Sequence, residues 1–241
     1  MKKSVFNIIL AVMAIAVALP VNLVAQKIKI PSTLSGKARE YYVGAMKGDE
    51  YSQLGLAVCY QNGDGAPKDY NQAIYWYQKA SEKDNVIAQY NLGCIYDEGV
   101  GVPRNYELAA FWYQKAAMRD DALAQCSLAN CYYNGDGMKK DYKKAAYWYE
   151  QAALQGNAVG QRCLGICYDE GKGVKKDHKK AAELYLKAAE QGDSDAQYNL
   201  AVLYYEGKGV KKDRDKAIEW FNKAAEQGDE DAKRALKKYS K

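Results

Sequence analysis

Cysteine and histidine are the residue types in this sequence best suited to metal or nucleophilic chemistry, and their spacing offers little of either. Cys163 and Cys167 lie one helical turn apart, a spacing that two metal ligands can use. His178 is the only histidine among the 241 residues, so the nitrogen ligands that would complete such a site are missing. We therefore expect no metal and no cofactor.

Carboxylates, serines and glycines also lack catalytic spacing. Asp97–Glu98 and Asp169–Glu170 are neighbours in sequence, so on a helix they point in different directions and do not form an acid and base pair. None of the eight serines begins a Ser-x-x-Lys motif, which would place a lysine one turn from a nucleophile. The glycine pairs recur as Gly-x-Gly and never as a phosphate-binding loop. We expect a protein that is not an enzyme.

The first 25 residues have the pattern of a secretory signal. Lys2 and Lys3 precede an apolar run from Val5 to Leu19, and the small residue Ala25 follows. The run is shorter than the roughly 20 residues of a membrane-spanning helix. We expect cleavage near Ala25, export to the bacterial periplasm or extracellular space, and no stable membrane insertion afterwards. An uncleaved anchor is the alternative.

The charge of the chain argues against a nucleic-acid partner. The formal net charge is +5, and it falls to +3 when the two lysines of the signal are removed. A nearly neutral chain of this size lacks the cations that bind phosphate backbones by counterion release. We therefore expect no nucleic acid among its partners.

The sequence repeats itself every 36 residues. Paired glycines mark the step, at Gly63 and Gly65, Gly99 and Gly101, Gly135 and Gly137, Gly171 and Gly173, and Gly207 and Gly209. This period predicts a stacked repeat protein. The predicted units are 49–84, 85–120, 121–156, 157–192 and 193–228. Half units at 35–48 and 229–241 are expected to cap the stack, and 26–34 reads as a linker.

Each unit has the periodicity of two helices. In the second unit Ala88, Leu92 and Tyr96 recur at four-residue steps, and Ala109 and Trp112 begin a second apolar stripe after the glycines. A side chain able to cap a helix precedes each stripe. These predicted N-caps are Asp49, Asn85, Asp121, Asn157 and Asp193 for first helices, and Asp69, Asn105, Asp141, Asp177 and Asp213 for second helices.

Positions that do not vary among the five units are expected to form the core. Two of these columns hold alanine, at Ala73, Ala109, Ala145, Ala181 and Ala217, and at Ala80, Ala116, Ala152, Ala188 and Ala224. A third holds all four tryptophans, Trp76, Trp112, Trp148 and Trp220, with Leu184 as the exception. Alanine lets two helices approach closely, so these columns predict tightly stacked helices.

The unit resembles the Sel-one-like repeat family, a branch of the tetratricopeptide superfamily. The resemblance rests on AQYNLG at Ala88–Gly93, on Tyr96, on the Gly-Val-Gly-Val turn, and on Asn105 with the helix that holds Trp112 and Tyr113. It implies an all-α fold, a right-handed α-solenoid of stacked antiparallel helix pairs. It also implies protein or peptide binding, often as an adaptor or regulator, here in the cell envelope.

Two other functions stay open. A secreted, cysteine-rich branch of the family is credited with binding and hydrolysing β-lactams, but the columns of its paired cysteines hold alanine and glutamine here, at Ala117, Ala153 and Ala189 and at Gln89, Gln125 and Gln161. Lysines before and after the second-helix caps could instead bind an anionic envelope glycan. Salt-sensitive glycan binding or turnover of a chromogenic β-lactam would distinguish these functions.

The resemblance places the binding residues on a concave face, at first-helix positions that the core does not use. Three variable columns lie there, and exposed tyrosine and arginine often anchor interfaces. The candidate binding residues are Leu54, Tyr90, Asp97, Asn130, Tyr133, Arg162, Asp169, Tyr198 and Tyr205.

Two cysteine pairs are candidate disulfides. Cys94 and Cys131, and Cys126 and Cys163, are each separated by one unit plus one residue, so both pairs would have similar geometry between adjacent first helices. Export would permit such bonds to form.

Overall fold

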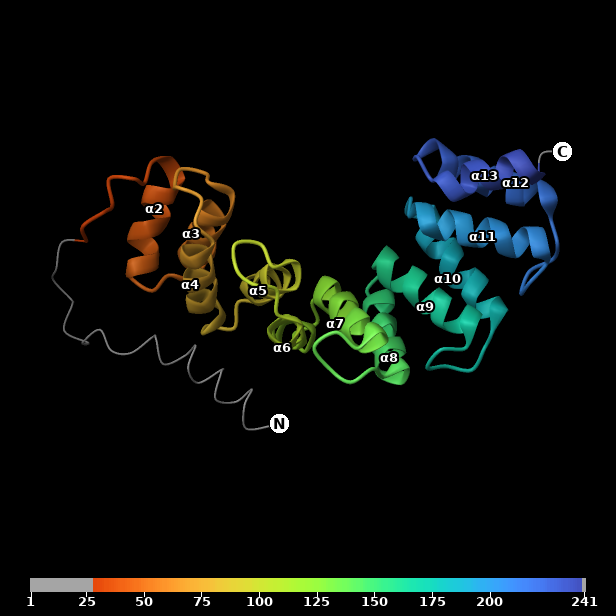
Figure 1. The fold of residues 1–241 in the computed structure, drawn as a ribbon, viewed down its shortest axis with the longest axis horizontal. Helices are drawn as coiled ribbons and strands as arrows, with labels where there is room; N and C mark the ends of the chain where they lie inside the picture. Colours follow the sequence, from red (N-terminus) through yellow and green to blue (C-terminus); the bar gives the residue numbers. More distant parts are fainter. Residues whose placement is uncertain (1–27, 240–241) are drawn as a thin grey trace. The chain divides into compact units, whose positions relative to one another are not determined.

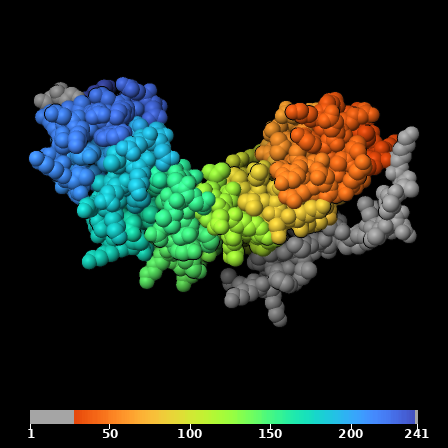
Figure 2. Space-filling model, turned by 180° about the vertical axis from the view of Figure 1, so that it is seen from behind, coloured from red at the N-terminus to blue at the C-terminus, as the bar shows by residue number. Residues whose placement is uncertain are grey.

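The computed structural model describes residues 28–239, and the expected signal, residues 1–25, lies outside this range. Within the described residues every regular element is an α-helix, and each helix packs against its neighbours in the chain (Figure 1). Figure 2 shows the chain in space-filling form, where successive colours lie next to one another in the order of the sequence. The predicted all-α solenoid is therefore confirmed.

Five helix pairs follow a single opening helix, and one helix closes the series. The opening helix is α2 (Gly36–Met46) and the closing helix is α13 (Glu230–Tyr239). The first helices of the pairs are α3 (Glu50–Asn62), α5 (Val86–Glu98), α7 (Ala122–Asn134), α9 (Ala158–Glu170) and α11 (Ser194–Glu206). The second helices are α4 (Tyr70–Ser81), α6 (Tyr106–Ala117), α8 (Tyr142–Leu154), α10 (His178–Glu190) and α12 (Arg214–Glu226).

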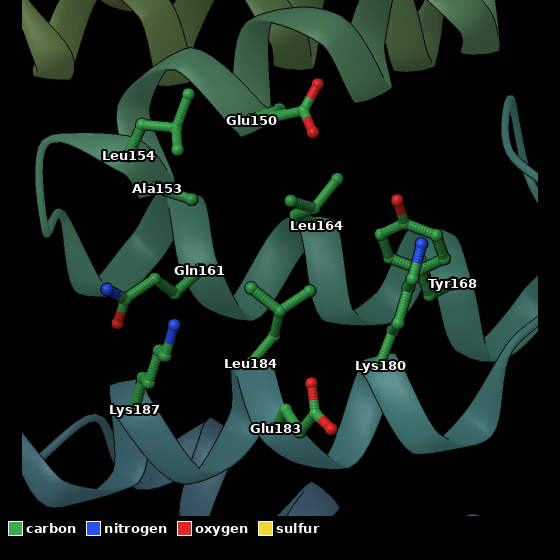
Figure 3. A pocket seen from close by; sticks show the side chains of 10 residues that line it. All are labelled: Glu150, Ala153, Leu154, Gln161, Leu164, Tyr168, Lys180, Glu183, Leu184 and Lys187. Atoms are coloured by element: carbon green, nitrogen blue, oxygen red, sulfur yellow. The ribbon is translucent and has the colours of Figure 1, made fainter.

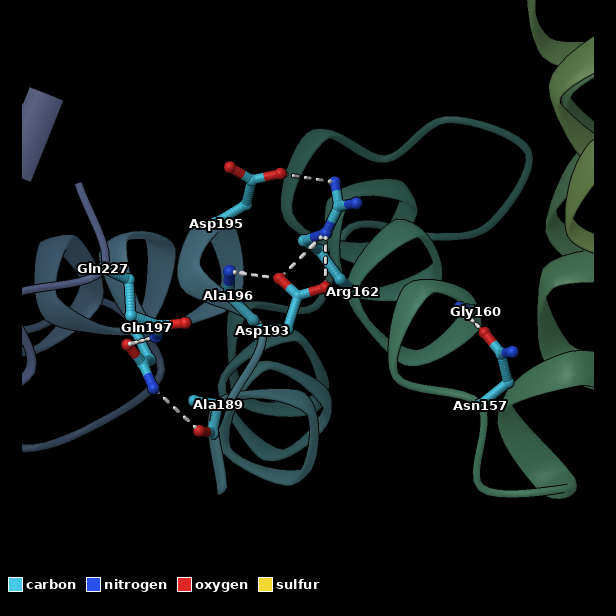
Figure 4. Close-up of polar contacts among 9 residues, drawn as sticks. All are labelled: Asn157, Gly160, Arg162, Ala189, Asp193, Asp195, Ala196, Gln197 and Gln227. Carbon is cyan, nitrogen blue, oxygen red and sulfur yellow. Dashed lines mark hydrogen bonds and ion pairs between the residues drawn. The ribbon is translucent and has the colours of Figure 1, made fainter. Parts of the chain in front are cut away.

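Side-chain caps set where each of these ten helices begins. All ten predicted N-cap residues accept a hydrogen bond from a first-turn amide. Asn157 accepts from the Gly160 amide at 2.9 Å and Asp193 from the Ala196 amide at 2.8 Å (Figure 4). These bonds satisfy amide groups that have no partner within the helix.

The two alanine columns lie in the core, as the sequence predicts, whereas in the tryptophan column Trp76 and Trp112 are buried and Trp148 and Trp220 are partly buried. Every alanine of the two alanine columns is fully buried, and Leu56, Leu92, Leu128 and Leu200 are buried beside them. The small side chains allow adjacent helices to lie close together, so the apolar surface of each helix is covered by its neighbours. No helix within residues 28–239 is both long enough and apolar enough to cross a membrane.

The second glycine of each pair lies where one unit touches the unit before it. Gly137 and Gly173 have φ angles of +69° and +76°, which L side chains rarely adopt. A Cβ atom at these two positions would run into the backbone at Tyr106 and Tyr142, the first residues of the preceding second helices. Glycine is therefore required at this contact between units.

Replacing this glycine should destabilise the stack more than replacing a glycine in open space. We expect Gly173→Ala to lower the free energy of unfolding by about 3 kcal/mol, because it combines a strained φ with a backbone clash. Gly192→Ala is the control, since Gly192 also has positive φ but no atom near its absent Cβ. It should cost about 1 kcal/mol. Urea unfolding followed by circular dichroism measures both, and equal losses would contradict the proposed contact.

Candidate functional site

The second residue of each first helix points away from the core. In the first four units this position holds Tyr51, Ile87, Leu123 and Val159, which are 75%, 55%, 51% and 38% exposed. We call these four residues the apolar ridge. The same position holds Asp195 in the fifth unit, so the ridge is confined to units one to four. Sequence reasoning missed this ridge, although its spacing of 36 residues was visible.

Four of the candidates, Leu54, Tyr90, Arg162 and Tyr198, occupy the same position in their first helices and pack against other helices rather than lying in open space. Tyr90 packs beside Tyr113 with ring centres 5.9 Å apart, and Tyr198 packs beside Phe221 at 5.6 Å. Leu54, Tyr90, Arg162 and Tyr198 are all partly buried. This column therefore contributes to packing as well as to the first-helix surface.

Arg162 shows most clearly how this column joins two units (Figure 4). Its guanidinium lies 3.0 Å from the carboxylate of Asp193, the N-cap of α11, and 3.2 Å from that of Asp195. The side chains of Arg162 and Asp193 are only 21% and 11% exposed. In the unit before, the Cys126 thiol donates to the side-chain oxygen of Asn157, the N-cap of α9. Arg162 thus links the fourth unit to the fifth through an ion pair.

Asp97 and Asn130 accept hydrogen bonds from tyrosines of the second helices. The Tyr113 hydroxyl donates to Asp97 at 3.2 Å, and the Tyr149 hydroxyl donates to Asn130 at 2.5 Å. Burial raises the pKa of both phenols well above the usual range, so they remain neutral donors. Asn130 is the one member of the candidate set with an exposed side chain.

Three further candidates are engaged with neighbouring charged or aromatic groups. The Tyr133 hydroxyl donates to Glu170 at 3.2 Å and accepts from the Lys172 ammonium at 2.8 Å. Asp169 lies 2.6 Å from the imidazole of His178. Tyr205 stacks on Tyr239 of the closing helix, with ring centres 3.9 Å apart. The structure distributes the nine candidates along the units and does not gather them into a single pocket.

A buried glutamine in every first helix was also missed. Gln197 donates to the Ala189 carbonyl at 3.1 Å and accepts from Gln227 at 2.8 Å, which fixes the turn between two units (Figure 4). The signal was present in the sequence, since Gln53, Gln89, Gln125, Gln161 and Gln197 form an invariant polar column. Because buried polar groups need partners, such a column predicts a structural hydrogen bond. Gln53, Gln125 and Gln197 donate one to a carbonyl of the preceding helix, whereas the side-chain amide of the fully buried Gln89 has no hydrogen-bond partner.

The six cysteines are free thiols in the structure, so neither candidate disulfide is formed there. Burial raises the pKa of Cys126, Cys131 and Cys167 to about 12. It also raises the pKa of Cys59, Cys94 and Cys163. Within residues 28–239 no group of three or more histidine, cysteine or carboxylate side chains could hold a metal ion.

The basic residues near the second-helix caps lie over tyrosine rings. Lys144, Lys180 and Lys216 lie 5.0–5.4 Å above the ring centres of Tyr132, Tyr168 and Tyr204. Cation–π attraction of this kind offsets the unfavourable position of a cation at a helix start. These lysines therefore have a packing role that requires no anionic ligand.

Comparison with known proteins gives the family. The model of the Sel1 repeat matches residues 50–85, 86–121, 122–157, 158–193 and 194–229, each one residue later than the predicted units. The chain belongs to the Sel1 repeat family. Members are generally repeat scaffolds for protein interactions. A search of curated proteins gave no significant match.

Two solved structures of Sel1 repeat proteins are similar over most of the chain. One is a protective antigen of uropathogenic Escherichia coli with an SLR fold, 42% identical over 83% of this chain, with a TM-score of 0.80. This chain spans 44% of that antigen's length. The other is a Sel1 repeat protein from Oxalobacter formigenes, 34% identical over 83% of this chain and 80% of its own, with a TM-score of 0.77.

Replacing Arg162 should lower the stability of the folded protein. We expect Arg162→Met to lower the free energy of unfolding by about 2–3 kcal/mol, because it leaves the largely buried carboxylate of Asp193 without its cation. Arg234→Met is the control, since Arg234 and Asp231 form an exposed pair within one helix. That change should cost about 0.3 kcal/mol. If the Arg162→Met protein is as stable as the wild type in urea, the ion pair between Arg162 and Asp193 does not stabilise the contact between units.

The thiols should be nearly unreactive in the folded protein. Raised pKa values leave little thiolate at pH 8, and burial hinders access, so we expect labelling by a disulfide reagent to be about 100-fold slower than after unfolding. The measurement compares the rate of colour release in buffer and in guanidinium chloride. Fast labelling of one or more thiols in buffer would contradict the burial described here.

Proposed function

We propose that this protein is an exported, non-catalytic scaffold that binds a segment of another protein across the face formed by its first helices. The observation that carries the proposal is the apolar ridge of Tyr51, Ile87, Leu123 and Val159. Aligned, exposed apolar side chains on a folded protein are typical of interaction surfaces. The partly buried tyrosines and Asn130 beside the ridge supply polar contacts for the same partner.

The rigidity of the stack suits this function. The first helices are held in place by their N-caps and by the buried alanines. The ion pair of Arg162 and the hydrogen bonds of Gln197 add contacts between units. The ridge is therefore preformed, and a partner that docks on it loses little additional conformational entropy from the scaffold. The segment that fits presents apolar side chains at a spacing that matches successive units.

Export is supported by the N-terminal residues and is consistent with a relative. Lys2 and Lys3 followed by an apolar run are typical of a secretory signal. The related Escherichia coli protein is described as a protective antigen, which agrees with a location outside the cytoplasm. We place the mature protein in the periplasm or outside the cell, where it acts as an adaptor or regulator.

Substitutions that the repeat itself tolerates can test the ridge. Aspartate stands at the ridge position in Asp195 and Asp231, so Ile87→Asp with Leu123→Asp should preserve the fold. We expect this double variant to capture its partner at least about tenfold less well than the wild type, because apolar anchors dominate such interfaces. The measurement is a cross-linked pull-down from the native envelope with quantitative mass spectrometry.

The matched control is Val100→Asp. Val100 is also exposed and apolar, it follows the opposite end of the same first helix, and the equivalent positions hold Asp64 and Asp136. This control should capture the partner as the wild type does. A partner recovered equally by the ridge variant, or no protein enriched by the wild type, would contradict the proposed function.

A further inference from the structure

One position breaks the tryptophan column, and a pocket lies there. Leu184 of α10 stands where four other units have tryptophan. A cavity of about 280 Å³ lies between α8, α9 and α10, with Leu164, Leu184 and Tyr168 among its lining residues (Figure 3). Leu154 and the lysines Lys180 and Lys187 also line it.

The other units place an indole against equivalent surroundings. Trp148 packs against the buried cluster of α6 and α7 that contains Leu128, and Trp220 packs against the cluster of α10 and α11 that contains Leu200. Leu184 packs in the same way against the cluster of α8 and α9 that contains Leu164. The smaller leucine side chain leaves part of this space unfilled, and the cavity occupies it.

A lysine that lies over the indole in the second and fifth units is retained beside the cavity. The Lys115 ammonium lies 5.1 Å from the ring centre of Trp112, and that of Lys223 lies 4.0 Å from the ring centre of Trp220. Lys187 occupies the same column and lines the cavity, where Leu184 offers it no ring. The site therefore retains the lysine of this column but has no indole for it to contact.

Size and chemistry indicate which ligand fits. Pockets for whole small molecules usually measure about 300–1,000 Å³, so a cavity of about 280 Å³ suits a single large side chain. Leu154, Leu164 and Leu184 provide apolar contacts, and a lysine in the lining favours an electron-rich ring, since indole attracts a cation most strongly. Glu150 and Glu183 line the same pocket and provide acceptors of the kind that an indole N–H requires.

We propose that the pocket at Leu184 binds the tryptophan side chain of a partner protein, replacing the indole that the fourth unit lacks. This site goes beyond the proposed function, because it lies between α8, α9 and α10 and none of the four ridge residues is among its lining residues. A partner that binds at both places would make two independent contacts with the protein. Its tryptophan would then determine which part of the partner lies against the fourth unit.

Leu184→Trp tests the proposal without risk to the fold, since tryptophan stands at this position in every other unit. The probe is N-acetyl-L-tryptophanamide, and binding is followed by saturation-transfer NMR with the full mature protein. We expect binding to the wild type and at least tenfold weaker binding to Leu184→Trp, whose own indole fills the pocket. Circular dichroism and thermal unfolding confirm that the variant is folded.

A second pair of variants tests the lysine. Lys187→Gln is compatible with the repeat, because the same column holds Gln151, and it should weaken probe binding about threefold. Lys115→Gln, in a unit whose pocket is filled by Trp112, should leave binding unchanged. The ridge variant Ile87→Asp with Leu123→Asp should also bind the probe normally, which separates this proposal from the proposed function.

Three results would overturn the proposal. These are absence of probe binding to the wild type, equal binding to the wild type and Leu184→Trp, and equal binding of N-acetyl-L-leucinamide in place of the tryptophan probe.

Discussion

The structure depends on a single constraint, which is that no helix pair of this chain can cover its own apolar surface. The alanine columns are fully buried only because the helices before and after each pair lie close against them. In such a stack, stability is the sum of what each unit contributes and what each contact between neighbours contributes. Everything that fixes the spacing between units, from the positive-φ glycines to the buried glutamines, serves this one requirement.

The same constraint determines which side chains remain free to bind. Residues on the flanks of the first helices are engaged by neighbouring helices, as Arg162 is by Asp193 of the next unit and Asp97 is by Tyr113 of the same unit. The exposed line of the first helices in units one to four, where the apolar ridge lies, stays free for a partner, as does any place where the packing is incomplete. The pocket at Leu184 is a place of the second kind.

The sequence predicts the fold well because the determinants of the fold are local and repeated. Capping residues such as Asp193, left-handed positions and buried alanines each have one physical explanation, and five copies confirm it. Even Asp84 and Asp120, which stand where other units have Gly156, Gly192 and Gly228, adopt the left-handed backbone of those glycines, with φ of 65° and 62°.

The binding residues are harder to predict, because their exposure depends on the neighbouring unit. Positions 51 and 54 are about 60° apart around one helix, and the 36-residue period does not say which of them the next unit covers. The sequence shows that Leu184 differs from its column, but only the packing around it shows that a cavity results. Likewise, the spacing of Cys126 and Cys163 could not reveal that the Cys126 thiol donates a hydrogen bond to the side chain of Asn157.

The most direct test of the central claim is native-state hydrogen exchange on an Ala181→Leu protein. Ala181 is fully buried in the cluster formed by α10 and α11, and a larger side chain must push the adjoining helices apart. If each unit depends on its neighbours, amide protection will fall across α9, α10 and α11 together. Loss of protection confined to α10 would contradict the account, because it would show that the helices are stable without close contact between units.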